Sequence, residues 1–233
     1  MFRVLLLLGL LLPQITLAQS TNGILAKHFE KCGQDQWNEI RTIQIDGKWV
    51  DKDYHAYSMQ LTAKAPDKVR IEGSYKGKNY VESYTGLFGW IMAPWKESYK
   101  IQKMDDEDEL IIRNVFSFGS PLYSVKDHLE FTGLMDMEGV LYNTFTLSEG
   151  DMKKIFYLDR DDHNLYYERI ESRFGREAIT VTKIYEKYKS YGPLTLPTAV
   201  RFKGLGLDRE FVFDEALLGI GANDALFDLP KGQ

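Results

Sequence analysis

Most of this chain alternates between apolar and polar residues with a period of two, which restricts the folds open to it. The alternation runs from Ile43 to Trp49 and, after the polar turn 51–53, resumes from Tyr57 to Leu61. Such a segment has one dry and one wet face, as a strand of an antiparallel sheet requires. An amphipathic helix would instead need apolar residues three and four positions apart. The sequence therefore predicts a mainly β protein.

Turn signals divide the rest of the chain into further strands. Clusters rich in Gly, Pro, Asp and Asn separate the alternating segments, for example at residues 65–67, 76–78 and 161–164. Their spacing predicts roughly 11 or 12 antiparallel strands. Those expected in the second half of the chain are residues 129–134, 140–147, 154–158, 165–173, 178–188, 198–203 and 210–213.

Two segments have helical spacing instead. Ile24, Leu25 and His28 share one side of an N-terminal helix that Gly33 is able to end. In the middle of the chain, residues 110–118 read as a helix preceded by acidic residues, which favour a helix N-terminus. A second short helix is expected at residues 121–127. A helical insertion thus interrupts the predicted sheet.

The first 18 residues have the pattern of a cleavable secretory signal. Arg3 supplies a positive charge, and the apolar run 4–12 is too short to span a bilayer of about 30 Å. Small residues up to Ala18 favour cleavage at that point. We expect residues 19–233 to form one domain that is exported and soluble. Cys32 is the single cysteine, so no intramolecular disulfide is expected.

The sequence contains few candidate catalytic or metal-binding residues. With 29 basic and 34 acidic residues, the net charge of −5 argues against a nucleic-acid binder. The four histidines are widely spaced, and residues 118–121 lack the second glycine of a nucleophile elbow. Residues 159–164 resemble the start of a calcium loop but lack its glycine and closing glutamate, which favours a hairpin turn. We therefore predict no enzyme activity, metal or cofactor; Asp159, Asp161 and His163 would be the first ligands to test.

The apolar face of such a sheet needs a cover. Thirteen Phe, 14 Tyr and 4 Trp are too many to leave in water. The sheet either closes into a barrel filled by its own side chains or curls around a cavity that holds an apolar ligand, and alternation does not separate these outcomes. The residues expected to converge on one concave surface are Ile43, Ile45, Trp49, Met59, Leu61, Val69, Ile71, Trp90 and Met92.

Several segments, in order along the chain, resemble the LolA family of periplasmic lipoprotein carriers. Residues 61–70 are similar to the family's strand–turn–strand unit, and residues 85–94 to its glycine turn and aromatic strand that ends in proline. Residues 224–230 are similar to its closing segment, in which a phenylalanine precedes a proline. Residues 157–171 resemble its late hairpin, and residues 24–33 with 37–43 are typical of outer-membrane lipoprotein-sorting proteins.

The resemblance implies an unclosed antiparallel β-barrel with helices as a lid over a hydrophobic cavity. It also implies a periplasmic carrier, monomeric and without cofactor, that binds acyl chains of lipoproteins and sorts them to the outer membrane. An inner-membrane ABC transporter complex and an outer-membrane acceptor would be its partners. The lid residues expected to contact ligand, together with the dry-face residues above, are Leu110, Ile111, Val115, Phe116, Phe118 and Leu122.

One tripeptide departs from the family pattern. Lys64-Ala65-Pro66 has alanine where the well-studied carriers have an arginine that tethers the lid. We therefore expect lid closure to rest on apolar contact alone, so that the lid opens easily. Three alternatives to lipoprotein sorting stay open: a binder of another lipid with the same fold, an envelope sensor or protein-interaction module, and an unrecognised hydrolase.

Overall fold

The computed structural model describes residues 21–96, 99–174, 177–204 and 208–230. The predicted signal, residues 1–18, lies outside the described residues. Within the described part, no helix combines the length and apolar character needed to cross a membrane.

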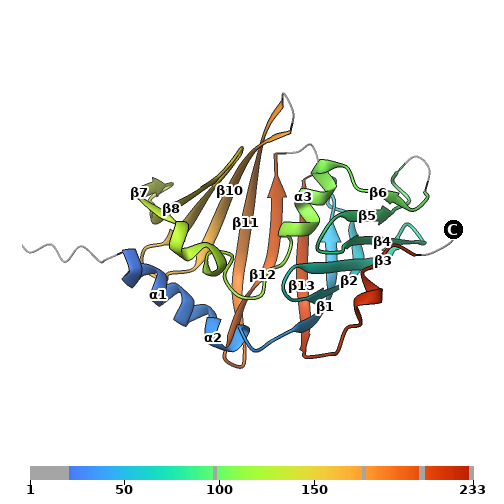
Figure 1. Cartoon of the computed structure of the whole chain (residues 1–233), viewed down its shortest axis with the longest axis horizontal. Helices are drawn as coiled ribbons and strands as arrows, with labels where there is room; N and C mark the ends of the chain where they lie inside the picture. The colour runs from blue at the N-terminus through green and yellow to red at the C-terminus, as the bar shows by residue number, and fades with distance from the viewer. Residues whose placement is uncertain (1–20, 97–98, 175–176, 205–207, 231–233) are drawn as a thin grey trace, which may run out of the picture.

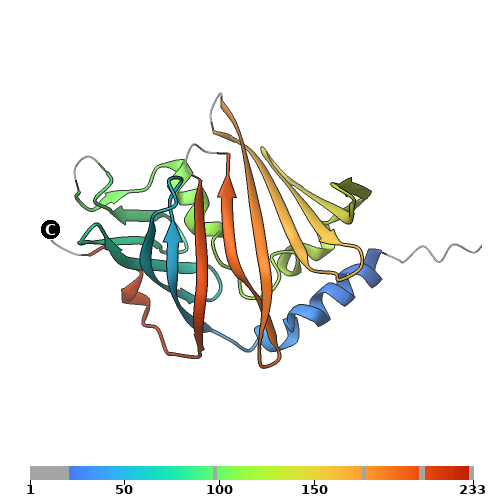
Figure 2. The same cartoon turned by 180° about the vertical axis from the view of Figure 1, so that it is seen from behind.

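One antiparallel sheet of 13 strands forms the body of the molecule (Figures 1 and 2). Its order is β6-β5-β4-β3-β2-β1-β13-β12-β11-β10-β9-β8-β7, so the edge strands β6 and β7 do not pair and the described sheet stays open. The predicted mainly β, unclosed antiparallel architecture is confirmed, with 13 strands in place of roughly 11 or 12. Their bounds are β1 (Thr42–Val50), β2 (Ala56–Lys64), β3 (Lys68–Tyr75), β4 (Lys78–Tyr84), β5 (Gly89–Met92), β6 (Gln102–Lys103), β7 (Glu130–Met137), β8 (Val140–Glu149), β9 (Met152–Asp159), β10 (Leu165–Phe174), β11 (Glu177–Tyr191), β12 (Leu194–Lys203) and β13 (Arg209–Leu218).

The first and last strands meet in the middle of this sheet. Strand β1 pairs with β2 on one side and with β13 on the other, and thereby joins the two meanders β1–β6 and β7–β13. The β1–β13 register shifts between Asp46 and Gly47. A Cβ atom on Gly47 would lie 2.1 Å from the carbonyl oxygen of Val212, so only glycine fits this close approach.

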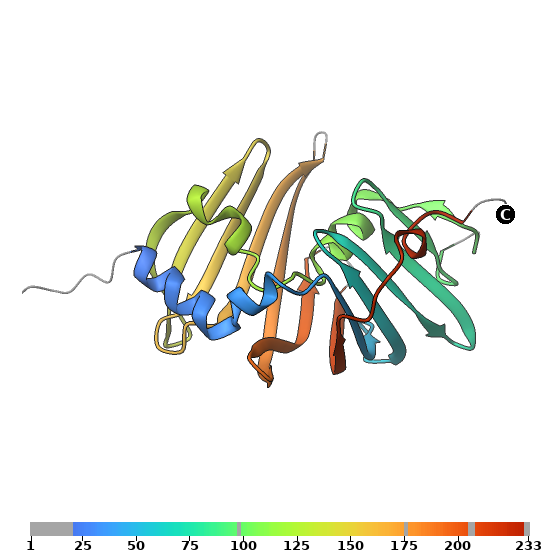
Figure 3. The ribbon, with the colours of Figure 1, turned by 60° about the horizontal axis from the view of Figure 1, so that its bottom comes forward.

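Helices cover the inner face of the sheet, which we define as the face toward α3 (Asp106–Asn114). That helix packs on β3, β4 and β5, whereas α1 (Thr21–Cys32) and α2 (Gln34–Trp37) contact β12 (Figure 3). Two 3₁₀ helices are also present: η1 (Tyr123–His128), and η2 (Asp224–Leu226), which belongs to the C-terminal segment on the outer face. As predicted, Gly33 follows the last residue of α1, with φ at +73°.

Helix α3 begins four residues earlier than the predicted start at residue 110. The carboxylate of Asp105 accepts a hydrogen bond from the backbone N–H of Asp108 and so caps the helix. The acidic residues expected before the helix therefore form its first turn, where the helix dipole stabilises them. The helix ends at Asn114, so residues 115–118 of the predicted helix continue in a different conformation.

Strand pairing places most of the predicted dry-face residues together. Ile45 lies opposite Leu61, and Leu61 opposite Ile71, so their side chains share one face across three strands. The same pairing puts the remaining members of β1–β3 on this inner face. All of them are buried: Ile43, Ile45, Trp49, Met59, Leu61, Val69 and Ile71.

Trp90 and Met92 are the exceptions, because the prediction that they share this face is wrong. Tyr84 pairs with Gly89 and lies opposite Val69, so Gly89 and Ile91 take the inner face of β5. Trp90 and Met92 consequently point to the outer face. The turn at residues 85–88 sets this register, and alternation within β5 alone cannot reveal it.

The C-terminal segment buries Trp90 on the outer face. Trp90 Nε1 and Ser83 Oγ both donate hydrogen bonds to the carbonyl oxygen of Phe227, at 2.8 and 3.0 Å. The Phe227 side chain is fully buried, and the Arg70 guanidinium lies 5.7 Å from the Trp90 ring centre. The part of the sheet formed by β3–β5 is thus covered on both faces, by α3 on the inner face and by the C-terminal segment on the outer face (Figure 3).

Replacing Phe227 should undock this segment. We expect Phe227→Ala to lower the free energy of unfolding by about 3 kcal/mol, since a buried aromatic ring is lost. Leu229→Ala is the control, because Leu229 is 44% exposed, and should change it by less than about 0.5 kcal/mol. Urea unfolding followed by tryptophan fluorescence measures both; equal effects would contradict the docked segment.

Candidate functional site

A helical segment closes over the inner face. We call residues 106–128 the lid segment: it consists of α3, the stretch 115–122 and η1, and it crosses in front of β11 and β12 in Figure 1. Ile111, Val115 and Leu122 are at most 1% exposed, and Phe116 is also buried. Leu110 and Phe118 are partly buried against the same core. The lid residues predicted from the sequence therefore all pack inward.

A cavity of about 340 Å³ lies between the lid segment and the sheet. This volume falls in the range of about 300–1,000 Å³ found for small-molecule sites. Its apolar walls come from both layers: Val69, Phe116, Phe118, Val125, Leu147, Met152 and Phe156. A smaller cavity of about 50 Å³ adjoins it at Phe116 and extends toward His28 and Trp37.

The cavity lies over a different part of the sheet from the predicted one. Of the predicted residues, Val69, Phe116 and Phe118 line the larger cavity, and Val115 and Phe116 line the smaller one. The predicted residues on β1 and β2, such as Ile45 and Leu61, are packed in the core instead. Helix α3 covers β3–β5, and the larger cavity runs from Val69 on β3 to the inner face of β8–β11 beneath the stretch 115–122.

The sequence prediction missed a charged cluster on the floor of this cavity. Glu168 is 1% exposed; its carboxylate lies 3.0 Å from Lys154 Nζ and 3.9 Å from Lys183 Nζ. The Tyr185 hydroxyl donates to the same carboxylate at 2.9 Å. Burial opposes ionisation of Glu168, but the two ammonium groups outweigh it and hold the pKa of Glu168 below its usual value.

Lys183 has the opposite environment. Burial lowers the pKa of Lys183 to about 8, and the attraction of Glu168 offsets this only in part. A signal for this cluster does exist in the sequence, because Lys183 stands between Val181 and Tyr185 at a position of the alternation that should be apolar.

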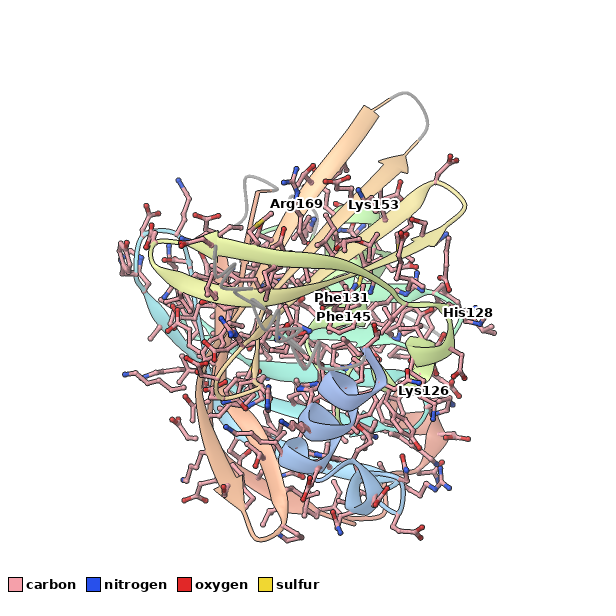
Figure 4. The ribbon with its side chains drawn as sticks, turned by 90° about the vertical axis from the view of Figure 1, so that its left-hand side faces the viewer. Lys126, His128, Phe131, Phe145, Lys153 and Arg169 are labelled. Carbon is pink, nitrogen blue, oxygen red and sulfur yellow. The ribbon has the colours of Figure 1, made fainter. Side chains whose placement is uncertain are left out.

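The inner-face side chains of β7–β11 form a single cross-strand row. It runs from Phe131 through Phe145 and Phe156 to Glu168 and Lys183. Phe131 is 37% exposed at the edge strand, and its ring centre lies 5.4 Å from that of Phe145. Figure 4 shows these two rings together near the centre of the view, with Lys153 and Arg169 above them. Aromatic surface therefore extends from the open edge to the charged cluster.

Polar contacts tether the lid segment, so the expectation that closure rests on apolar contact alone is wrong. The Glu109 carboxylate accepts the N–H of Gly89 at 2.9 Å, and Lys154 Nζ donates to Asn114 Oδ1 at 3.1 Å. Farther along, the N–H of Ser120 donates to Gln34 Oε1 at 2.8 Å. These partners belong to β5, β9 and α2, and none of them depends on Ala65.

Histidine 28 adds a further tether from α1. Its Nδ1–H donates to the carbonyl oxygen of His163 at 2.8 Å, which leaves Nε2 to accept from the Ser120 hydroxyl at 2.7 Å. The residue is therefore neutral in this arrangement. Burial is the main cause that lowers the pKa of His28 to about 4.

The loop considered as a metal site, residues 159–164, and the β1–β2 loop both form turns. The Asp159 carboxylate accepts the N–H groups of Asp161 and Asp162, each at 2.8 Å, as expected for a hairpin turn. Ligand atoms of Asp51, Asp53 and His55 lie within 4.8 Å of one another in the β1–β2 turn. The Asp51 carboxylate is already an acceptor for the N–H groups of the other two.

Comparison with known proteins rests on structure. No protein-family model matches the sequence, and no curated protein matches it. A LolA superfamily protein from Nitrosomonas europaea aligns over 90% of this chain and 98% of its own length, with a TM-score of 0.58 and 14% identity. A DUF1329 family protein from Desulfovibrio piger aligns over 88% and 97%, with a TM-score of 0.56 and 11% identity. This chain has a LolA-like fold. At such low identities, the likeness concerns the fold alone.

The LolA-like fold accounts for the arrangement described above. An unclosed sheet with a helical lid over its inner face is what the sequence resemblance implied, and that part of the prediction is confirmed. The likeness in fold does not extend to particular side chains. The buried Glu168 and Lys183 in particular are features of this chain's own sequence.

The buried neutral His28 predicts a loss of stability in acid. The folded protein binds a proton on His28 more weakly than the unfolded chain, whose histidine pKa is near 6.5. The contribution of His28 to the free energy of unfolding is therefore fully present above pH 6.5. It declines by about 3 kcal/mol as the pH falls to about 4. Urea unfolding at several pH values should give a shallower decline for His28→Gln than for wild type. His128→Gln, at an exposed position, should retain the wild-type slope; a variant slope identical to wild type at position 28 would refute this.

Proposed function

We propose that this protein is an exported periplasmic carrier that binds the acyl chains of lipoproteins and helps to sort them to the outer membrane. The observation that carries the proposal is the cavity of about 340 Å³ beneath the lid segment of a LolA-like fold. Aromatic side chains from both layers line it, Phe116 and Phe118 from the lid and Phe156 from the sheet. Residues 19–233 act as one lipid-binding domain, monomeric and without a cofactor.

The energetics suit reversible binding without covalent chemistry. Each methylene group transferred from water to an apolar site contributes about 0.8 kcal/mol, so a long acyl chain gains on the order of ten kcal/mol. Part of this offsets the opening of the lid, whose tethers at Asn114 and Ser120 must break to enlarge the cavity. An acyl ligand therefore replaces lid contacts with its own, which makes loading and release an exchange.

The proposed route determines the partners. The signal in residues 1–18 directs the chain to the periplasm. An inner-membrane ABC transporter complex would load the cavity, and an outer-membrane acceptor would receive the cargo. The net charge of −5 gives nucleic acid no role.

A second candidate function is the carriage of a lipid other than a lipoprotein. Two observations favour it: Ala65 stands in place of the family arginine, and the cavity floor contains Glu168 and two lysines where acyl chains alone would need only apolar walls. An envelope sensor or protein-interaction module with the same fold is the alternative without lipid cargo.

Lipid extraction tests the carrier role directly. Protein purified from its native envelope, extracted with organic solvent and measured by mass spectrometry, should release acylated material in stoichiometric amount. A lipopeptide would support lipoprotein sorting, and a free lipid would support the second candidate. Extraction of no lipid, together with no binding of added lipid, would contradict both and leave the sensor role.

Hydrogen exchange tests the movement of the lid. Adding a palmitoylated peptide should increase the protection of residues 106–128, because the opened segment closes over the ligand. The same peptide without its acyl chain is the matched control and should change nothing. If residues 106–128 are as protected as the sheet without ligand, and the acylated peptide adds no protection, the lid proposal fails.

A substitution in the cavity wall should weaken lipopeptide binding. Phe118→Ala removes a ring that lines the cavity, and the lost apolar contact should raise the Kd about tenfold, equivalent to about 1.4 kcal/mol. Leu87→Ala is the control, because Leu87 is 87% exposed and lies outside the cavity. Titration monitored by tryptophan fluorescence measures both affinities, and equal values for the two variants would argue against this binding site.

A further inference from the structure

The cavity floor contains more positive than negative charge. Lys154, Glu168 and Lys183 line the cavity together, two ammonium groups against one carboxylate. Glu168 directs one carboxylate oxygen at Lys154 Nζ, at 3.0 Å, and the other accepts from the Tyr185 hydroxyl. Lys154 is further engaged by Asn114 of the lid. Oε2 of Glu168 is thus engaged without Lys183, whereas Oε1 has the ion pair with Lys154 but no hydrogen-bond donor among the described residues.

Lys183 has the weakest set of partners in this cluster. Its side chain is 3% exposed, and Glu168 Oε2 lies 3.9 Å from Nζ, beyond hydrogen-bond distance. The remaining contact is with the face of the Tyr185 ring, whose centre lies 4.5 Å away. Among the described residues, this ammonium group donates no hydrogen bond. Burying a charge in this way is costly unless a partner completes it.

The position of Lys183 shows where such a partner would bind. Lys183 lines both the larger cavity and the smaller one, and thus lies at their junction. Phe116 also borders both cavities, and Phe156 lies next to Glu168 in the cross-strand row. A buried cation beside the aromatic walls at Phe116 and Phe156 matches a molecule with an anionic head and an apolar tail.

We propose that the cavity binds an anionic amphiphile, with the carboxylate or phosphate of its head group on Lys183 and Lys154 and its acyl chain along Phe116, Phe118 and Phe156. This rests on the proposed lipid-carrier function in its second form, the carriage of a lipid other than a lipoprotein, and specifies the ligand class. The head group supplies the hydrogen-bond acceptors that Lys183 lacks, and charge-assisted hydrogen bonds of this kind are the strong ones. The acyl chains of a lipoprotein are joined through neutral ester and amide groups, so the proposal favours a free anionic lipid.

Matched ligands separate the charge from the chain. The probes are hexadecanoic acid, hexadecyl phosphate and hexadecan-1-ol, which share one chain and differ in the head group. Delipidated mature protein should bind the acid or the phosphate at least tenfold more tightly than the alcohol at pH 7. Whichever anion binds more tightly identifies the head group as carboxylate or phosphate.

Two lysine variants locate the interaction. Lys183→Met should abolish the preference for the anion while the affinity for the alcohol is retained, because the apolar walls are unchanged. Lys153→Met is the matched control: Lys153 neighbours Lys154 on β9 but is exposed, and it lies outside the cavity. This control should retain the preference. If Lys183→Met does not fold, as judged by near-ultraviolet circular dichroism, Lys154→Met replaces it with the same expected loss.

The outcomes distinguish the two levels of the proposal. Equal binding of the acid, the phosphate and the alcohol would overturn the anion site but leave the lipid-carrier function standing. A preference that survives in both Lys183→Met and Lys154→Met would also overturn it. If none of the three probes binds to the cavity, the proposed function itself fails.

Discussion

The pairing of β1 with β13 is the contact on which the rest of the structure depends. It joins two meanders that would otherwise each expose an unpaired strand edge where the other begins. Gly47 allows it, because any side chain there would collide with the backbone of Val212. Once joined, the meanders present a continuous inner face, and one lid segment is able to cover both of them.

The two halves of that inner face have different uses. Over β3–β5, helix α3 packs directly on the sheet, and residues such as Leu61 and Ile71 form a filled core. Over β8–β11, the lid is an irregular stretch that does not fill the space, and the cavity remains. The charged cluster around Glu168 lies only in this second half. The fold thus combines a rigid core and a ligand-sized space within one sheet.

The sequence was sufficient for most of the strands and for the face of the first three, because alternation with a period of two reports local burial. It failed at Trp90, since a tryptophan covered by the C-terminal segment alternates like one covered by the core. The tethers of the lid were equally out of reach. Ala65 indicated only that the family's arginine is missing, whereas the replacements come from Gln34 and Lys154, which are distant in sequence. Pairing between remote segments decides such contacts, and no local pattern encodes it.

The central position of β1 also affects the order in which the molecule folds. During synthesis, the first meander is complete once residue 103 has emerged, but the partner of β1 begins only at Arg209. Until then, Ile43–Val50 forms an unsatisfied edge next to apolar side chains, which invites pairing with another copy of the chain. Contacts this far apart in sequence also form slowly. A chain of this topology therefore exposes one edge of β1 until its last strand is available.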